Sequence, residues 1–284
     1  MMVKGKPNIA SARLFLKQLI QRILDNRLPD LSAQLAFYFL LSLFPFLIFA
    51  MALFGYFVSS EEVLALLSRY VPSASMDVIE GNVRDVLDVE RGSLLSFGMV
   101  ATIWSASHAT NALIRALNEA YDVEESRPFW KARGTAIVLT FALIGILLVA
   151  LILPVFGQAI GLLFFSLFHM TEAFWSVWNV LRWGISFTIL FSVLVFLYYA
   201  APNKRLDLRD IAAGALFATV SWQLVSYAFS FFVNEFGHYS ATYGGLAGAI
   251  VLMLWFYLTG LILLVGGEIN ATLHFLKRER ITGP

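Results

Sequence analysis

Polar side chains recur inside long apolar stretches of this chain, and their spacing places them on shared helix faces. Steps of three and four residues bring side chains to one face of an α-helix, and His108, Asn111, Arg115, Asn118 and Asp122 follow such steps. Lipid offers no hydrogen bonds, so polar groups at depth must face other helices or a wet cavity. The pattern predicts buried contacts at His108 and Asn111, whereas the lower part is either buried too or the solvated face of a helix that continues beyond the membrane.

A second polar stripe follows a later helix. Its members are Thr219, Gln223, Ser226, Ser230 and Asn234, again at steps of three and four. Ser and Thr in apolar helices often bond their own backbone or hold neighbouring helices together. Gln223 is harder to explain in this way, because a primary amide near the middle of a span needs partners. The stripe is therefore either helix packing or the lining of a substrate pathway.

Arg182 is the one Lys or Arg inside a predicted span, and it shares a helix face with Asn179 and Ser186. Three tryptophans between 175 and 183 are typical of an aromatic belt at a membrane surface. Near such a surface the arginine extends its charged end into the interface. If it lies deeper, it is a fixed cation suited to a phosphate or a carboxylate.

Glu268 closes the last apolar stretch, and Gln34 enters the first at the same expected depth, the inner interface. Glu268 either pairs with a cytoplasmic arginine or contacts a substrate. Bending and packing points are also predicted: each proline removes a backbone donor and favours a kink, and small residues four apart allow helices to approach closely. These residues are Pro45, Pro154, Gly244, Gly245 and Gly248.

The residues needed for common enzyme chemistry are missing. There is no cysteine, and the four histidines fall on different sides of the predicted membrane. No metalloprotease, nucleophile-elbow, phosphate-loop or dinucleotide-binding motif occurs. We expect no catalytic residue, no metal, no cofactor and no nucleic-acid partner.

Composition indicates the class of protein. Hydrophobic residues make up 59% of the 284 residues and charged residues 14%, whereas soluble proteins hold about 25% charged residues. The mean hydropathy is +0.76. A soluble domain of this size could not enclose so much apolar surface, which favours an all-α polytopic membrane protein.

A spanning helix needs about 20 apolar residues, and six stretches qualify. They cover about 33–58, 93–113, 134–157, 177–201, 211–233 and 245–267, and the second is the most polar. Together they form a transmembrane domain over 31–276, preceded by residues 1–30 and followed by a tail, 277–284. Residues 1–30 carry a basic amphipathic pattern, which predicts a helix lying on the membrane surface.

The distribution of charge predicts the orientation. Sixteen of the 20 Lys and Arg lie in 1–30, 114–133, 202–210 and the tail. Since basic residues favour cytoplasmic segments, both termini are expected in the cytoplasm. Seven acidic residues crowd the first outside segment, about 60–90, whose pattern predicts short amphipathic helices. These form either a cap on the bundle or a docking surface for an extracytoplasmic partner.

Several segments form a recognisable set: AQLAFYFLLSLFP at 33–45, FGHYSATYG at 236–244 and GGEINA at 266–271, with further segments at 104–107, 116–121, 127–131, 198–203 and 214–220. Together they resemble the YihY/BrkB family of bacterial inner-membrane proteins. The resemblance implies a bacterial cell (inner) membrane location. The family was long labelled ribonuclease BN, yet its members are otherwise described as transporters or envelope-resistance factors. Some look linked to movement of lipids or lipopolysaccharide precursors, and no agreed catalytic residues can be carried over.

Residues and resemblance together predict a multi-pass transporter or flippase for an amphipathic, lipid-like anion. The residues expected to contact it are Arg182, Asn179, Ser186, Gln223, Ser226, Ser230, Asn234, His108, Asn111, Gln34 and Glu268. The alternative is a non-transporting scaffold for envelope assembly that docks a partner through its acidic outer helices. Expected partners are the lipid bilayer, the lipid-like substrate, an envelope protein and a second copy of the chain in a homo-oligomer.

Overall fold

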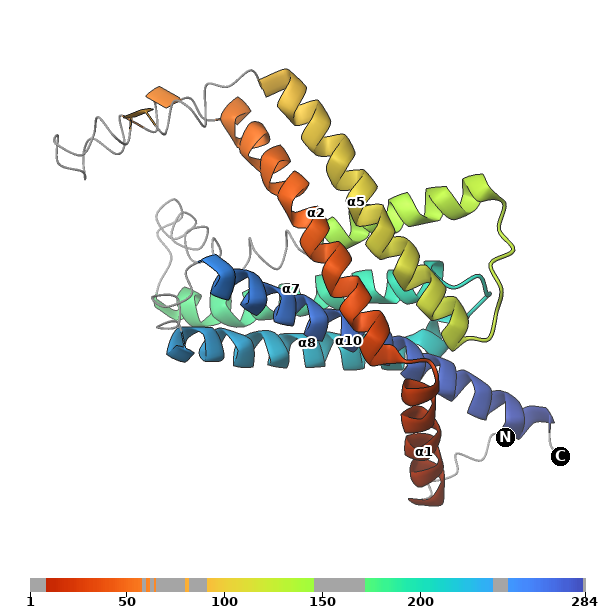
Figure 1. Cartoon of the computed structure of the whole chain (residues 1–284). Helices are drawn as coiled ribbons and strands as arrows, with labels where there is room; N and C mark the ends of the chain where they lie inside the picture. The colour runs from red at the N-terminus through yellow and green to blue at the C-terminus, as the bar shows by residue number, and fades with distance from the viewer. Residues whose placement is uncertain are drawn as a thin grey trace. The chain divides into compact units, whose positions relative to one another are not determined.

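The computed structural model describes residues 9–57, 60–61, 64, 80–81, 91–145, 172–236 and 245–282. Within these ranges every regular element is a helix and no strand occurs, which confirms the all-α prediction. The helices, shown in Figure 1, are α1 (Ile9–Asp25), α2 (Leu28–Phe57), α5 (Arg91–Ala120), α7 (Glu172–Ala200), α8 (Leu208–Phe236) and α10 (Gly245–Thr282). Residues 129–145 are also helical.

Four of the described helices are long and apolar enough to cross a membrane. The qualifying stretches are Leu28–Phe49, Val180–Ala200, Leu208–Phe232 and Gly248–Arg278, and they coincide with the first, fourth, fifth and sixth predicted spans. The second predicted span, 93–113, lies within the continuous helix α5 but does not reach the same hydropathy, because Ser, Thr and His interrupt its apolar residues. The third, 134–157, is described as far as 145. Six spans therefore remain a prediction.

The chain divides into two compact units, a smaller one of residues 37–109 and a larger one of residues 1–36 with 110–284. In the smaller unit, α2 and α5 come close at Gly98, where an added Cβ would lie 2.9 Å from the backbone nitrogen of Phe49. The absence of a side chain at Gly98 thus allows the two helices to approach. Pro45 lies inside α2, which remains helical on both sides of it.

In the larger unit, the chain breaks between α1 and α2 at Arg27, whose φ of 47° is left-handed. The backbone nitrogen of Asn26 still bonds the carbonyl of Arg22 at 2.9 Å, and the new helix opens at Leu28 with Pro29 in its first turn. Proline is tolerated there, since its missing N–H would have no partner inside the helix. The break lets α1 turn away and lie against α10 (Figure 1).

Helices α7, α8 and α10 meet at two glycines in the larger unit. A Cβ at Gly214 of α8 would overlap the carbonyl oxygen of Gly266, and a Cβ at Gly266 would overlap the hydroxyl of Tyr198 in α7. Tyr198 donates its hydroxyl to the Leu263 carbonyl at 2.7 Å, and the Gly214 backbone nitrogen donates to Asn270 Oδ1 at 2.6 Å. Small residues thus bring the backbones of α8 and α10 into contact, as in many membrane helix bundles, and the Tyr198 side chain joins α7 to α10.

The close-packing glycines differ from those that the sequence analysis selected. An added Cβ at Gly248 meets nothing within 4 Å, so that position has open space next to it in this chain. Gly245 begins α10, whereas Gly244 and Pro154 lie outside the described residues. A packing role for Gly244, Gly245 and Gly248 stays a prediction.

Candidate functional site

The most deeply buried charge described in the structure is the carboxylate of Glu268. It lies on α10 within the apolar stretch Gly248–Arg278, and its residue is 1% exposed. Oε2 accepts a hydrogen bond from Arg22 Nε at 3.0 Å, and Oε1 accepts one from Asn26 Nδ2. A buried carboxylate persists when it is paired and hydrogen-bonded. Glu268 thus has the arginine partner that the sequence analysis considered as an alternative to substrate contact.

Arg22 connects three helices. Besides Glu268, it donates Nη2 to the Ala120 carbonyl at the end of α5. Its guanidinium also lies 4.8 Å from the ring centroid of Phe275 on α10 and 3.8 Å from Asp122 Oδ2. Arginine suits such a position because its planar fork donates in several directions and stacks on aromatic rings. One side chain of α1 therefore joins the end of α5 to the C-terminal half of α10.

Tyr121 lies next to this ion pair with its hydroxyl buried. Among the described residues no group hydrogen-bonds its oxygen, and its ring lies edge-on to His274 at 5.9 Å. Burial, with the negative charges of Asp210 and Glu268 adding to it, raises the pKa of Tyr121 above its usual value. Tyr121 therefore stays a neutral phenol at physiological pH.

Asp210 joins the start of α8 to the last turns of α10. Its Oδ1 lies 2.8 Å from Lys277 Nζ, and its Oδ2 lies 3.7 Å from His274 Nδ1. We call Arg22, Asn26, Tyr121, Asp210, Glu268, His274 and Phe275, together with Lys204 described below, the inner polar cluster. It gathers side chains from α1, α8 and α10 and from the connections that follow α1, α5 and α7.

A neighbouring network fixes the two connections beside the cluster. Asn118, buried at the end of α5, accepts a 2.6 Å hydrogen bond from the Asn203 backbone nitrogen and donates to Glu125 at 3.0 Å. Arg127 binds Glu125 and also the last carbonyls of α7, those of Ala200 and Ala201. The Arg127 hydrogen bonds lower the pKa of the Glu125 carboxyl more than burial raises it. The network caps α7 and orders the connection to α8.

The first predicted stripe passes through several environments. His108 belongs to the smaller unit, where its ring stacks on Tyr38 at 6.0 Å and meets Trp104 edge-on at 4.7 Å. Asn111 is half-buried, Arg115 is exposed, and Asn118 is buried in the network. The lower part is thus neither wholly buried nor a simple solvated face.

The stripe on α8 also changes character along its length. Thr219 is buried and donates to the carbonyl of Ala215 in its own helix at 2.7 Å, as the packing interpretation expects. Gln223 is half-buried, Ser230 is exposed, and the Ser226 hydroxyl is buried without a described partner. The side chain of Asn234 lies outside the described residues.

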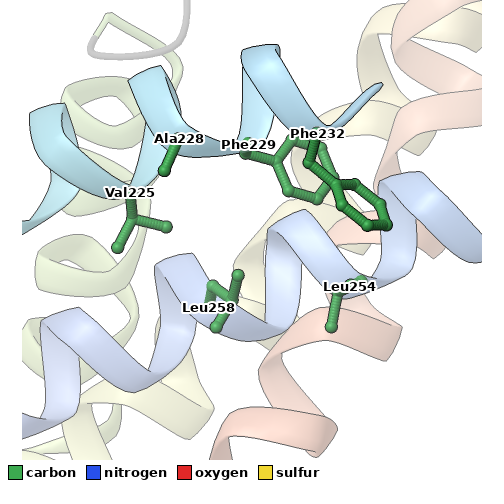
Figure 2. Close-up of a pocket in the computed structure, with 6 residues that line it drawn as sticks. All are labelled: Val225, Ala228, Phe229, Phe232, Leu254 and Leu258. Atoms are coloured by element: carbon green, nitrogen blue, oxygen red, sulfur yellow. The ribbon is translucent and has the colours of Figure 1, made fainter. Parts of the chain in front are cut away.

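Figure 2 shows an apolar groove between α8 and α10, which the predicted α8 stripe does not line. Its lining residues are Val225, Ala228, Phe229, Phe232, Leu254 and Leu258. Because the lining carries no polar side chain, this groove offers nothing to recognise a head group.

Arg182 lies half-buried near the start of the apolar stretch of α7, and Ser186, one turn further, is half-buried too. No hydrogen bond or ion pair joins Arg182 to another residue in the described parts of the chain. The side chain of Asn179 lies outside them. Gln34 on α2 is exposed, and no described contact joins it to Glu268.

Sequence reasoning missed most of the inner polar cluster. The sequence analysis used Arg22 and Lys204 only as basic residues that predict the membrane orientation. It did not select Asn26 or Asp210. The Arg22–Glu268 contact joins residues 246 positions apart, so no local pattern could reveal it. The available signal was the resemblance, since 116–121, 198–203 and 266–271 all lie at or beside the cluster.

Long apolar helices packed through glycines, with a buried ion pair in one of them, define a helical integral membrane protein. Comparison with known sequences then identifies the group: the profile of the Virulence factor BrkB family matches residues 19–283, and the chain belongs to this family.

Its relatives carry two kinds of name. A ribonuclease-like protein of Bacillus subtilis, YfkH, is 49% identical over 94% of this chain and 97% of its own. UPF0761 membrane proteins of Aliivibrio salmonicida and Alkalilimnicola ehrlichii are each 28% identical, over 92% and 89% of this chain. This chain spans 82% of the former and 57% of the latter. No solved structure matches the chain.

The described parts of the chain contain no candidate metal site of the kind that a metal-dependent ribonuclease would use. No group of three or more His, Cys, Asp or Glu residues there could hold a metal ion. The names of the other relatives describe membrane proteins and not enzymes.

Proposed function

We propose that this protein is a transporter or flippase of the bacterial cell (inner) membrane, with six spans and both termini in the cytoplasm, that moves an amphipathic anion. The observation that carries the proposal is the buried Glu268 carboxylate, held within an apolar helix by Arg22 of α1. Ionisable residues inside membrane helices are costly, and they commonly mark substrate or ion pathways.

The nature of this contact supports a gating role. An apolar pair of similar volume would often stabilise a bundle as well as a buried ion pair does, so stability alone does not explain it. The pair joins two helices, and Arg22 prefers carboxylate or phosphate oxygens. An anionic substrate would compete with Glu268 for Arg22 and thereby loosen α1 from α10. In this proposal the ion pair closes the inner end of the pathway.

The surroundings of α1 agree with this placement. Its exposed face carries Leu16, Ile20 and Leu24, which are 55%, 57% and 67% exposed, next to the exposed Arg13 and Lys17. Apolar residues flanked by bases suit the boundary between acyl chains and anionic head groups. We place α1 on the cytoplasmic surface of the membrane, with Arg22 on a different face.

The outer end of the proposed pathway involves α7 and α8. Arg182 lacks an acidic partner among the described residues. The Ser226 hydroxyl is buried without a hydrogen-bond partner among them. In the proposal, Arg182, Ser186, Gln223 and Ser226, with Asn179, Ser230 and Asn234, contact the anionic substrate there, and His108, Asn111 and Gln34 contact it further in.

Transport is tested with the purified full chain in phosphatidylcholine vesicles that contain a fluorescent phosphatidylglycerol. A membrane-impermeant quencher then reports movement between leaflets. We expect movement faster than in protein-free vesicles, and a change of about tenfold or more in Glu268→Gln, since losing a charge-assisted hydrogen bond alters the gate by more than 1.4 kcal/mol. Lys277→Gln is the control, because it removes an exposed charge from the same helix.

The proposal fails if folded protein moves neither labelled lipids nor organic anions faster than protein-free vesicles. The scaffold interpretation would then take its place. It requires that deletion of about 60–90 abolishes function in cells while the remaining chain stays folded, and that a crosslinked partner maps to that segment.

A further inference from the structure

Lys204, in the connection between α7 and α8, holds its ammonium between two aromatic rings. Its Nζ lies 5.5 Å from the ring centroid of Tyr121 and 5.1 Å from that of Phe275. No carboxylate of the described residues lies within ion-pair distance of it. Since ring faces attract the charge without using up all three N–H donors, the ammonium retains the capacity to bind an acceptor.

The acids nearby are already engaged or lie in solvent. Arg22 and Asn26 bind Glu268, and Lys277 pairs with Asp210. The Asp122 side chain is 68% exposed and lies 3.8 Å from Arg22. Arg22 and Lys277 thus each have an acidic partner, whereas Lys204 has none within ion-pair distance among the described residues.

The electrostatics of Lys204 agree with its lack of an acidic partner. Burial lowers the pKa of Lys204, and the positive charge of Arg278 lowers it further, whereas Asp122 acts in the opposite direction. A bound anion would offset both lowering effects, because hydrogen bonds and a negative charge favour the charged ammonium. The aromatic rings hold Lys204 in place before any ligand arrives, which reduces the entropy lost on binding.

We propose that Lys204 binds the phosphate group of a ligand at the inner polar cluster. A phosphate offers several strong acceptor oxygens and more than one negative charge, so it can satisfy neighbouring cations at once. The ligand is either an anionic phospholipid or a soluble phosphate. The inference rests on the proposed function, because it names phosphate as the anionic group of the transported substrate. The binding itself does not require transport.

The test measures binding to the purified full chain in detergent. In one arm, micelles contain equal amounts of phosphatidylglycerol and phosphatidylcholine, and native mass spectrometry counts retained lipids. In the other, inorganic phosphate replaces chloride at equal ionic strength, and the shift in the unfolding temperature is recorded. We expect Lys204→Gln to weaken binding at least about tenfold, as for other charge-assisted hydrogen bonds. Lys131→Gln, the matched control, should bind like the wild type, because the exposed Lys131 lies outside the inner polar cluster.

Each outcome decides the inference. Loss of one retained phosphatidylglycerol in Lys204→Gln supports a lipid phosphate, and loss of the shift with inorganic phosphate supports a soluble one. Equal binding by Lys204→Gln and Lys131→Gln in both arms overturns it. If Lys204→Gln fails to fold, Lys204→Met and Lys204→Arg replace it. Lys204→Met should weaken binding and Lys204→Arg should retain it, and equal binding by these two variants then overturns the inference.

The binding and transport experiments can reject the phosphate site and the transport function independently of each other. Binding that depends on Lys204, in a protein that moves nothing across vesicles, would leave the phosphate site standing without the transporter. Transport by a protein whose Lys204→Gln variant binds like the control would leave the transporter without this site.

Discussion

Arg22 Nε of α1 donates a 3.0 Å hydrogen bond to Glu268 Oε2 of α10, and this contact joins the two ends of the chain. Glu268 is 1% exposed, whereas the Arg22 side chain is 23% exposed. The acid is thus enclosed by protein, while its partner lies at the edge of the bundle. This asymmetry makes Arg22 the member of the pair that a ligand can reach first.

Breaking this pair is predicted to destabilise the protein strongly. Arg22→Met should lower the free energy of unfolding by about 3–5 kcal/mol, because it leaves the Glu268 carboxylate buried without its cation. The double variant Arg22→Met with Glu268→Met should lose much less than the sum of the two single variants. Unfolding by denaturant in detergent micelles measures all three, and additive losses would show that the pair does not couple α1 to α10.

Two buried tyrosines should respond in opposite ways to loss of their hydroxyl. Tyr198→Phe removes the 2.7 Å bond to the Leu263 carbonyl and should cost about 1 kcal/mol. Tyr121→Phe removes a buried hydroxyl without a described partner, so it should be neutral or stabilising. Each variant is the control for the other in thermal unfolding, and equal losses would contradict the assignment.

Alanine at the packed glycines should destabilise the contact between α8 and α10. A Cβ at Gly214 overlaps the backbone of Gly266 and the amide of Asn270, which predicts a loss of about 1–3 kcal/mol from overpacking. Gly248→Ala is the matched control, because nothing lies within 4 Å of its added Cβ and alanine favours a helix. Equal stability of the two variants would show that the approach at Gly214 is not close.

The Glu125–Arg127 contact predicts a dependence of stability on pH. Arg127 holds the pKa of Glu125 below its usual value, so the ionised carboxylate stabilises the folded protein above the usual carboxyl range. This contribution disappears as pH falls from the usual carboxyl range through the lowered pKa of Glu125. Unfolding temperatures of wild type and Glu125→Gln should therefore converge on acidification. A constant difference from pH 7 to pH 3 would rule out the ion pair as its cause.

Site-directed labelling tests the position of α1. The chain has no cysteine, so single cysteines introduced at Leu16 and Gln21 can each carry a spin label. The label at Leu16, on the exposed apolar face, should contact oxygen dissolved in lipid, whereas the label at Gln21 should contact a water-soluble nickel complex. Two water-exposed labels would place α1 away from the bilayer.

Much of the fold was predictable from the sequence, because the length and periodicity of apolar runs are local properties. The four apolar helices fall where the hydropathy places them, and the matched segments identified the family that the profile confirms. Helix ends were less predictable. The last predicted span was expected to end at 267, yet the apolar stretch of α10 continues to Arg278 and the helix to Thr282, because packing buries the polar residues Glu268, Asn270 and Thr272.

The candidate site was only partly predictable. Glu268 was selected because an acid beside an apolar run is unusual, and that signal is local. Its partners Arg22 and Asn26, and the rings around Lys204, come from distant segments whose helix faces meet through packing. Likewise, spacing alone could not distinguish Gly248, which has open space beside it, from Gly214, which touches another backbone. By itself the sequence determined a helical membrane protein and its family, since burial in lipid selects apolar composition residue by residue. The tertiary structure decided which charges pair and which glycines pack, because those contacts depend on the faces that helices turn toward one another.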